Sequence, residues 1–341
     1  MGKYDMMKKS NITLKELSKI LGVSISTISK ALNDSPEISH DTKIKVKELA
    51  ALHNYQPNVL ARNLKSGTTK TIAVVLPTVK NNFFTEVLLG IETEIVKTDY
   101  NIIISITNES FEKEAQSVNN LSNGIVDGFI LSTSEETQVK QNFNHLTAAI
   151  DNNKPIVMFD RVIKTIESDK VLEDNREAVY KATNYLLKSG KKHIAIASTI
   201  NNITVGKSRT AGYKKALEEF GITLNENDII TGSQDSIKSE VDHYLKTNKP
   251  DAFIGLDEDA TLSALKSVKQ KNYNIPQEVA VVGYANQNIA PHLTPELTTI
   301  DQNGIEIGRT IVKLLIDRLK NPTKPYEKVV LPSILCKRLS S

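Results

Sequence analysis

Three short helices are predicted near the start of the chain, and they constrain the fold more than any other feature of the sequence. Thr13 and Glu16 form the capping-box pair that begins a helix, and apolar residues then recur at helical spacing. After a tight turn, Ser24 can cap a second helix over residues 25–32, and Ser39 can cap a third. Each helix has an apolar stripe, so the pattern predicts a small three-helix domain with a single core.

The predicted second helix has the composition of a helix that reads DNA. It carries several small hydroxyl residues, and Ile28, Ala31 and Leu32 form its apolar stripe. A helix in the major groove needs short side chains for close approach, polar groups for base edges and phosphates, and a buried stripe. A generic three-helix bundle with merely solvated serines is the alternative, but the complete pattern favours a helix-turn-helix domain.

This segment resembles the lactose-repressor (LacI/GalR) family of transcription regulators. The resemblance rests on residues in the turn, in the recognition helix and after the third helix: Val23, Ser24, Thr27, Ser29, Leu32, Asn33, Tyr55, Pro57, Asn58, Ala61, Arg62 and Leu64. It implies a helix-turn-helix domain over residues 12–57, and a hinge helix and linker over 58–70. In a homodimer, two such heads read the halves of a palindromic double-stranded operator. The hinge helices then meet in the minor groove, with Leu64 as the wedge.

The recognition helix and its flanks carry the expected DNA contacts. We expect base contacts from Ile25, Ser26 and Lys30, and Lys30 is the best candidate to read guanine. Contacts to phosphates are expected from Ser24, Thr27, Ser29 and Asn33. The further DNA-binding positions expected are Thr13, Tyr55, Asn58, Ala61, Arg62, Leu64 and Lys65.

Charge separates this head from the rest of the chain. Residues 1–70 carry twelve basic and six acidic side chains, a net charge of +6, so the rest of the 341-residue chain carries −3 of the total of +3. Local positive charge suits phosphate neutralisation, and an acidic body limits indiscriminate binding. A chain of this length is also too long for one ordinary core, which predicts two or three domains.

From residue 71, short β-branched runs alternate with helical stretches. The runs predicted to be strands are TIAVVL, NIIISI, DGFIL and PIVMF in a first series, and HIAIAS, DAFIGL, EVAVVGY and TTIDQ in a second. Helices are expected within FFTEVLLGIETEIVKT and near residues 111–122, 138–150, 175–189, 208–220, 236–247 and 258–271. Near-continuous apolar strands that alternate with helices predict two α/β units with parallel sheets.

The resemblance to the LacI/GalR family extends across this region. It implies a two-lobed domain like the periplasmic sugar-binding proteins, with three crossover strands and the ligand in the cleft between the lobes. The resulting effector-binding and dimerisation domain would span residues 71–341. Lobe 1 would comprise about 71–171 and 303–331, and lobe 2 about 172–302 and 332–341.

Ligands of open parallel sheets bind beyond the carboxyl ends of the strands, so the loops there form the candidate effector site. The candidates are Asn82, Phe83, Phe84, Asp160, Arg161, Arg209, Asp257, Asn286 and Gln302, with Asn81 beside the first of them. An aromatic ring suits the apolar face of a sugar or a base, and Asp160 with Arg161 can accept from and donate to hydroxyl groups. By the family likeness, Arg209 is the cleft arginine at the opening of its helix.

One departure from the family pattern bears on the effector. Many members carry an acidic residue directly after the tyrosine of the strand EVAVVGY, whereas Ala285 and Asn286 follow Tyr284 here. This difference weakens the case for borrowing an effector from a known sugar or purine sensor. Asn286 can still donate and accept, so a neutral hydroxyl ligand is compatible with the cleft.

No catalytic, metal or cofactor site is predicted. Gly206-Lys207-Ser208 lacks the glycine that a phosphate-binding loop needs five residues earlier, since Asn201 stands there. The chain has no GxG, HExxH or GxSxG motif, and its single cysteine, Cys336, excludes an internal disulfide. No apolar run reaches membrane-spanning length and the opening residues lack a signal-peptide core, so we expect a cytoplasmic protein without a membrane partner.

Together these features predict a homodimeric transcription regulator that is controlled by a small-molecule effector, a sugar or sugar derivative. Its expected role is to repress a carbohydrate uptake or catabolism operon. No leucine heptads follow the last strand, so assembly should stop at a dimer. One alternative is a regulator of the same fold controlled by a nucleobase or a phosphorylated protein partner. The other is a free ligand-binding receptor for transport, which would need export and would not use residues 1–67.

Overall fold

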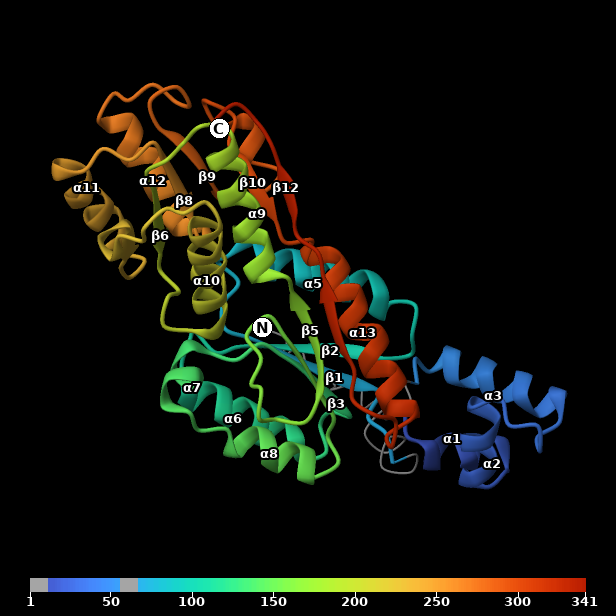
Figure 1. Cartoon of the computed structure of the whole chain (residues 1–341). Coiled ribbons are helices and arrows are strands. Elements are labelled where there is room, and N and C mark those ends of the chain that lie inside the picture. The colour runs from blue at the N-terminus through green and yellow to red at the C-terminus, as the bar shows by residue number, and fades with distance from the viewer. Residues whose placement is uncertain (1–11, 56–66) are drawn as a thin grey trace, which may run out of the picture. The chain divides into compact units, whose positions relative to one another are not determined.

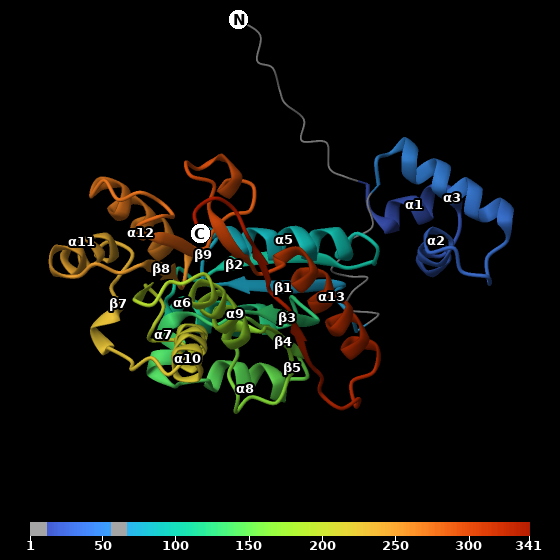
Figure 2. The same cartoon turned by 45° about the horizontal axis from the view of Figure 1, so that its top comes forward.

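The computed structural model describes residues 12–55 and 67–341, and the chain divides into two compact units after Gly67. Figures 1 and 2 show the two units from different sides. The predicted hinge helix over residues 58–65 lies outside the described residues.

The N-terminal unit is the three-helix domain that the sequence predicts. It consists of α1 (Leu14–Leu21), α2 (Ile25–Leu32) and α3 (His40–Leu52). The capping box is formed, because Thr13 N donates to Glu16 Oε2 at 2.7 Å and Glu16 N donates to Thr13 Oγ1 at 3.3 Å. Gly22 ends α1 at φ 65°, a left-handed conformation that glycine adopts without a Cβ clash. The buried core consists of Leu17, Ile28, Ala31, Val46 and Ala50.

The second unit contains two six-stranded sheets, and the first of them forms lobe 1. Its strands are all parallel, in the order β11-β5-β4-β3-β1-β2. They are β1 (Thr71–Leu76), β2 (Asn101–Ile106), β3 (Gly128–Leu131), β4 (Ile156–Phe159), β5 (Asp169–Glu173) and β11 (Lys328–Leu331). The helices of this lobe are α5 (Asn82–Ile95), α6 (Phe111–Ser122), α7 (Glu135–Lys140), α8 (Asn144–Asp151) and α13 (Gly304–Lys320). α5 and α13 cover one face of the sheet, and α6 and α8 cover the other.

Lobe 2 repeats this architecture around the order β12-β10-β9-β8-β6-β7, and only β12 runs antiparallel to its neighbour. The strands are β6 (Ile194–Ser198), β7 (Ile229–Thr231), β8 (Ala252–Gly255), β9 (Ala280–Tyr284), β10 (Thr298–Asp301) and β12 (Ile334–Cys336). The helices are α9 (Asn175–Lys188), α10 (Thr204–Glu219), α11 (Ile237–Thr247) and α12 (Glu258–Gln270), with short 3-10 turns at Glu226–Asp228 and Ala290–His292. α9 and α10 cover one face of the sheet, and α11 and α12 cover the other.

The chain crosses between the lobes three times, after β5, after β10 and after β11. Two of these crossovers are bonded to each other. Ser333 N donates to Asp174 Oδ1 at 2.8 Å, and the Ser333 hydroxyl donates to Glu173 Oε1 at 3.0 Å. These bonds hold the crossover strands together, so a change of angle between the lobes would pivot here.

Several boundaries differ from the sequence-based prediction. The helix expected over residues 138–150 is two helices, because Gln141 adopts a left-handed φ of 52° and ends α7. The helix expected from residue 208 begins at Thr204. Its first turn packs closely on the preceding loop, where a Cβ on Gly206 would lie 2.0 Å from Ile200 O, and this contact outweighs the low helix propensity of glycine. β5 extends to Glu173, so the first crossover lies slightly later than expected. Within the described ranges, no helix is long and apolar enough to span a membrane.

Candidate functional site

The start of α2 presents the hydroxyl groups that the sequence assigns to DNA. Ser24, Ile25 and Ser26 are exposed, and the Ser24 hydroxyl accepts from the Thr27 amide at 3.1 Å. Ser24 Oγ also lies 2.7 Å from Ser26 Oγ and 2.8 Å from Thr27 Oγ1. This cluster caps the helix and keeps donors and acceptors at its surface, where a phosphate or base edge could bind them.

The end of α2 places Lys30 beside an acidic residue that the sequence analysis missed. Lys30 Nζ forms an ion pair with Glu37 Oε2, and the hydrogen bond from Lys30 lowers the pKa of Glu37. Asn33 ends the helix, and its Nδ2 donates to Ser29 O at 2.8 Å. Glu37 therefore engages one of the N–H donors of Lys30, and a guanine would share or compete for this ammonium.

The remaining predicted DNA contacts fall into two groups. Thr13 caps α1 and Tyr55 packs partly against the core of the head, so both residues also have structural roles. The others lie outside the described residues, namely Asn58, Ala61, Arg62, Leu64 and Lys65.

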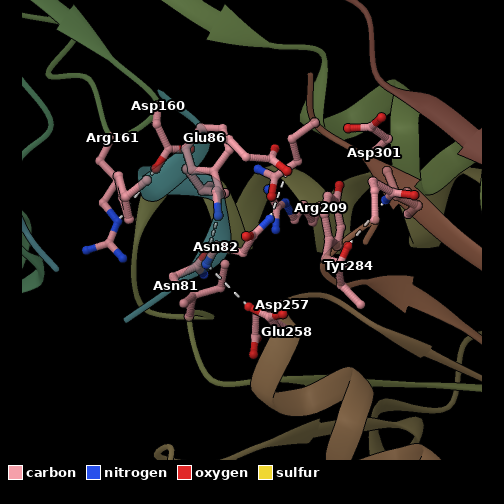
Figure 3. A pocket seen from close by; sticks show the side chains of 18 of the residues that line it. Asn81, Asn82, Glu86, Asp160, Arg161, Arg209, Asp257, Glu258, Tyr284 and Asp301 are labelled. Carbon is pink, nitrogen blue, oxygen red and sulfur yellow. Dashed lines mark hydrogen bonds and ion pairs between the residues drawn. The ribbon is translucent and has the colours of Figure 1, made fainter. Parts of the chain in front are cut away.

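The second candidate site is the cleft between the two lobes of the larger unit, shown in Figure 3. Eight of the nine predicted effector residues line it: Asn82, Phe83, Phe84, Asp160, Arg161, Arg209, Asp257 and Gln302. Further lining residues, which the prediction did not include, are Glu86, Ile200, Ile203, Val205, Glu258, Tyr284, Ala285, Gln287, Ile300 and Asp301. This cavity measures about 60 Å³, below the ~300–1,000 Å³ of typical ligand sites, and a neighbouring cavity of about 830 Å³ shares Asn81, Arg161, Ile200 and Asp257 with it.

Arg209 lines the cleft, and three neighbouring residues accept hydrogen bonds from its guanidinium group. It is 3% exposed and lies in the second turn of α10 rather than at its opening. Its Nε donates to Asn175 Oδ1 at 2.6 Å, its Nη1 to Leu256 O at 2.6 Å and its Nη2 to Glu173 Oε2 at 3.2 Å. Its guanidinium also stacks 3.5 Å from the centroid of the Tyr284 ring. Arg209 is thus a structural residue of lobe 2 as well as a candidate ligand contact.

Glu173 is the buried partner of this arginine and was not singled out from the sequence. Gln302 Nε2 donates to Glu173 Oε2 at 2.6 Å, so the predicted Gln302 joins the same network. Burial raises the pKa of the Glu173 carboxyl, and this effect outweighs the opposite effect of the positive charge on Arg209. The network therefore depends on a positive charge at Arg209.

Asp160 and Arg161 lie together at the end of β4 but have different surroundings. Arg161 Nη1 donates to both carboxylate oxygens of Glu109, at 2.8 and 2.6 Å, and its Cζ lies 5.6 Å from the Phe84 ring centroid. Asp160 is 8% exposed, and its carboxylate is 3.8 Å from Arg161 Nε. No described residue donates a hydrogen bond to this carboxylate, and burial raises its pKa. Asp160 is thus placed to accept from a ligand hydroxyl.

The two phenylalanines only border the cleft. Phe84 is 2% exposed and packs edge-on against Phe159, with ring centroids 6.1 Å apart, and Phe83 packs against Phe84 at 5.3 Å. Both belong to the core of lobe 1. Stacking of either ring on a ligand therefore stays a prediction.

Asn286 and Asn82, both predicted from the sequence, are bonded to each other at the junction of the lobes. Asn286 does not line the cavity, but its Nδ2 donates to Asn82 Oδ1 at 2.8 Å across the cleft. Glu258 accepts from Asn286 N at 3.2 Å and from Asn82 N at 3.5 Å, so an acidic side chain is present although none directly follows Tyr284. The preceding Asp257 caps α12 and also accepts from Thr199 N at 2.7 Å.

Comparison with known proteins gives the family. Residues 13–58 match "Bacterial regulatory proteins, lacI family", and residues 183–341 match a "Periplasmic binding protein-like domain". The chain is 31% identical over 322 residues to the "Ribose operon repressor" of Haemophilus influenzae, covering 94% of this chain and 95% of that protein. It is 30% identical over 321 residues to the "HTH-type transcriptional repressor PurR" of Vibrio atlanticus, covering 93% and 94%.

A solved structure shows the same fold. The lac repressor dimer bound to operator and the anti-inducer ONPF matches with a TM-score of 0.85 at 20% identity, over 97% of this chain and 99% of that one. The resemblance that the sequence suggested is confirmed, since the similarity runs through the head and both lobes. This chain belongs to the lacI family of bacterial transcription regulators.

Proposed function

We propose that this protein acts in the cytoplasm as a homodimeric repressor of a carbohydrate uptake or catabolism operon. Its heads bind a palindromic operator, and an effector in the cleft changes its affinity for DNA. The observation that carries this proposal is the combination, in one lacI-family chain, of an exposed recognition helix with a cleft lined by polar groups from both lobes. A free receptor for transport would have no use for such a head.

For DNA we assign base reading to Ile25, Ser26 and Lys30, because they lie on the part of α2 that the core leaves accessible. The Ser24 and Thr27 hydroxyls suit phosphates. We also retain the DNA contacts expected from the sequence for Thr13, Ser29, Asn33 and Tyr55, and for the hinge positions Asn58, Ala61, Arg62, Leu64 and Lys65.

A sugar fits the cleft better than a nucleobase. The rings that would stack on a flat base are held in the core, whereas carboxylates, guanidinium groups and amides line the space. The relative named "Ribose operon repressor" supports a sugar, and the one named "HTH-type transcriptional repressor PurR" keeps a nucleobase as the second candidate.

An exposed apolar surface supports the dimer. β2 is an edge strand of lobe 1, yet Ile103, Ile104 and Ile106 on it are all exposed. Leu89 on α5 and Val96 directly after this helix are more than half exposed. Edge strands with exposed large apolar residues invite pairing with another chain, and monomers usually protect them. We assign this surface to contact with a second copy of the chain.

Coupling between effector and operator requires contacts that depend on the angle between the lobes. Two such contacts are Asn286 Nδ2 to Asn82 Oδ1, and Thr204 N to Gln138 Oε1 at 2.9 Å. An effector that favours one lobe angle shifts the balance between the forms that make and break these bonds, and with it the DNA-competent state.

Fluorescence anisotropy with a labelled operator duplex tests this function. Wild-type protein should change its operator affinity when the correct sugar is added. Asp160→Asn should leave effector-free operator binding within about twofold but weaken the effector response at least tenfold, because head and cleft lie in separate units. Asp151→Asn, at an exposed site on the same lobe, is the control. An Asp160→Asn protein that responds at wild-type effector concentrations would contradict the assignment.

A further inference from the structure

The lining of the cleft is strongly electronegative. Its acidic residues are Glu86, Asp160, Asp257, Glu258 and Asp301, and its basic residues are Arg161 and Arg209. Each of the two guanidinium groups is already paired with a carboxylate that lies outside the lining, Arg161 with Glu109 and Arg209 with Glu173. The lining therefore holds more carboxylates than guanidinium groups, and both guanidinium groups are already paired with carboxylates of the protein.

Three of these carboxylates line the cavity from three different elements. Glu86 comes from α5, Glu258 from the first turn of α12 and Asp301 from the end of β10 (Figure 3). The pKa of Glu86 is raised, first by burial and then by the charges of Asp301 and Glu258. Only amide donors reach them among the described residues, such as Asn82 Nδ2 to Glu86 Oε1 at 2.9 Å.

Glu86 lies close to the start of α13. A Cβ on Gly304, at the start of α13, would lie 2.8 Å from Glu86 Cβ and 3.1 Å from its Oε2. The glycine therefore gives the glutamate room at the edge of the cavity. A ligand that brings a positive charge would relieve the mutual repulsion of Glu86, Glu258 and Asp301.

Asp160 supplies an independent sign of a ligand in the same cleft. It is more than nine-tenths buried, it lines the cavity, and no described residue donates a hydrogen bond to its carboxylate. Arg161 Nε, at 3.8 Å, offsets its charge without a hydrogen bond, so a ligand hydroxyl that donates to Asp160 would lower the cost of burying it. The cleft thus offers one acceptor for a hydroxyl and a separate group of carboxylates.

We propose that the effector carries a protonated amine, as in an amino sugar or amino polyol, and that its ammonium binds among Glu86, Glu258 and Asp301 while a hydroxyl donates to Asp160. A primary ammonium has three N–H donors, which matches three carboxylate acceptors. Phosphorylated and carboxylated sugars are excluded by like-charge repulsion. This inference rests on the proposed function, because it assigns the chemical class of the ligand for the same cleft.

Isothermal titration calorimetry of the full-length protein with matched ligand pairs tests this inference. The panel contains glucosamine, galactosamine, mannosamine and a 1-amino-1-deoxy polyol series, each with its neutral parent, its N-acetyl form and the 6-phosphate of the parent. At least one amine should bind, with its neutral parent about tenfold or more weaker and its phosphate without measurable binding. Raising the salt concentration should weaken binding of the amine but not of the neutral parent.

Variants locate the ammonium within the cleft. Glu86→Gln keeps the shape of the side chain and should weaken the amine about 10- to 100-fold while leaving the neutral parent nearly unchanged. Glu92→Gln, at an exposed site on the same helix, should change neither. Equal effects of Glu86→Gln on both ligands would place the ammonium elsewhere and overturn the assignment.

The inference and the proposed function fail in different ways. A neutral or phosphorylated sugar that binds as tightly as the amine, or a panel in which no amine binds, overturns the inference and leaves operator binding untouched. Loss of sequence-specific DNA binding by the same preparation would instead overturn the proposed function.

Discussion

Replacing Arg209 with methionine removes the positive charge at the centre of the buried network in lobe 2. Glu173 then keeps only its neutral partners, and the acceptors on Asn175 and Leu256 lose their donor. Removing one partner of a buried ion pair costs about 3–5 kcal/mol, because the other charge is left uncompensated. For a unit of this size, that corresponds to a fall in melting temperature of roughly 6–20 °C.

The loss of stability caused by Arg209→Met should depend on pH in a defined direction. Burial already raises the pKa of Glu173 in the native protein. Without Arg209, the folded-state pKa of Glu173 rises further above its unfolded value of ~4.3. A carboxyl with a raised folded pKa favours the folded state when it is protonated, and this contribution is lost as the pH rises from the unfolded pKa through the folded one. The deficit of Arg209→Met should therefore shrink toward pH 5 and grow toward pH 8, by up to ~1.4 kcal/mol per pH unit.

Urea unfolding followed by circular dichroism between pH 5 and pH 8 measures this dependence. Lys207→Met, at an exposed site on the same helix, is the control and should be nearly neutral. Glu173→Gln combined with Arg209→Met removes both charges and should be more stable than Arg209→Met alone. A stability deficit that is equal at pH 5 and pH 8, or a melting temperature within about 2 °C of wild type, would show that Arg209 does not compensate the buried charge of Glu173.

Three other changes test separate parts of the structure. Lys30→Ala should relax the preference at one operator base pair at a cost of ~1–3 kcal/mol, measured by anisotropy on operator variants, and an equal loss on every variant would show that Lys30 does not read a base. Gln138→Leu removes the acceptor for Thr204 N, so small-angle scattering should show a more open domain and effector titration should show an altered affinity. If neither value changed, this hydrogen bond would not hold the two lobes together. Gly90→Ala would place a Cβ 2.1 Å from Ile305 O and should cost ~1–3 kcal/mol in urea unfolding by forcing α5 and α13 apart, whereas wild-type stability would contradict that packing.

The sequence predicts the head well because its signals are local. Thr13 and Glu16 bond to each other within one helical turn, and the apolar stripe of α2 needs only a period of 3.6 residues. The strands of both lobes are similarly readable as continuous apolar runs, and eight of the nine predicted effector residues line one cavity since they follow those strands.

Contacts between distant parts of the chain could not be predicted in this way. Glu86 becomes a cleft residue only when lobe 2 brings Glu258 and Asp301 toward it, although its position one helical turn after Asn82 was a usable signal. The partnership of Arg209 with Glu173 depends on the crossover between the lobes, so neither residue reveals it alone.

The most direct test of the account is selection of binding sites from random duplex DNA by the full-length protein at physiological salt, followed by affinity measurement on the enriched sequence. A homodimeric repressor should select a two-fold symmetric site and bind it at least ~10³-fold more tightly than a scrambled duplex, and the preference should be lost when either half-site is scrambled. Equal affinity for the enriched and scrambled duplexes, or a selected site without two-fold symmetry, would contradict it.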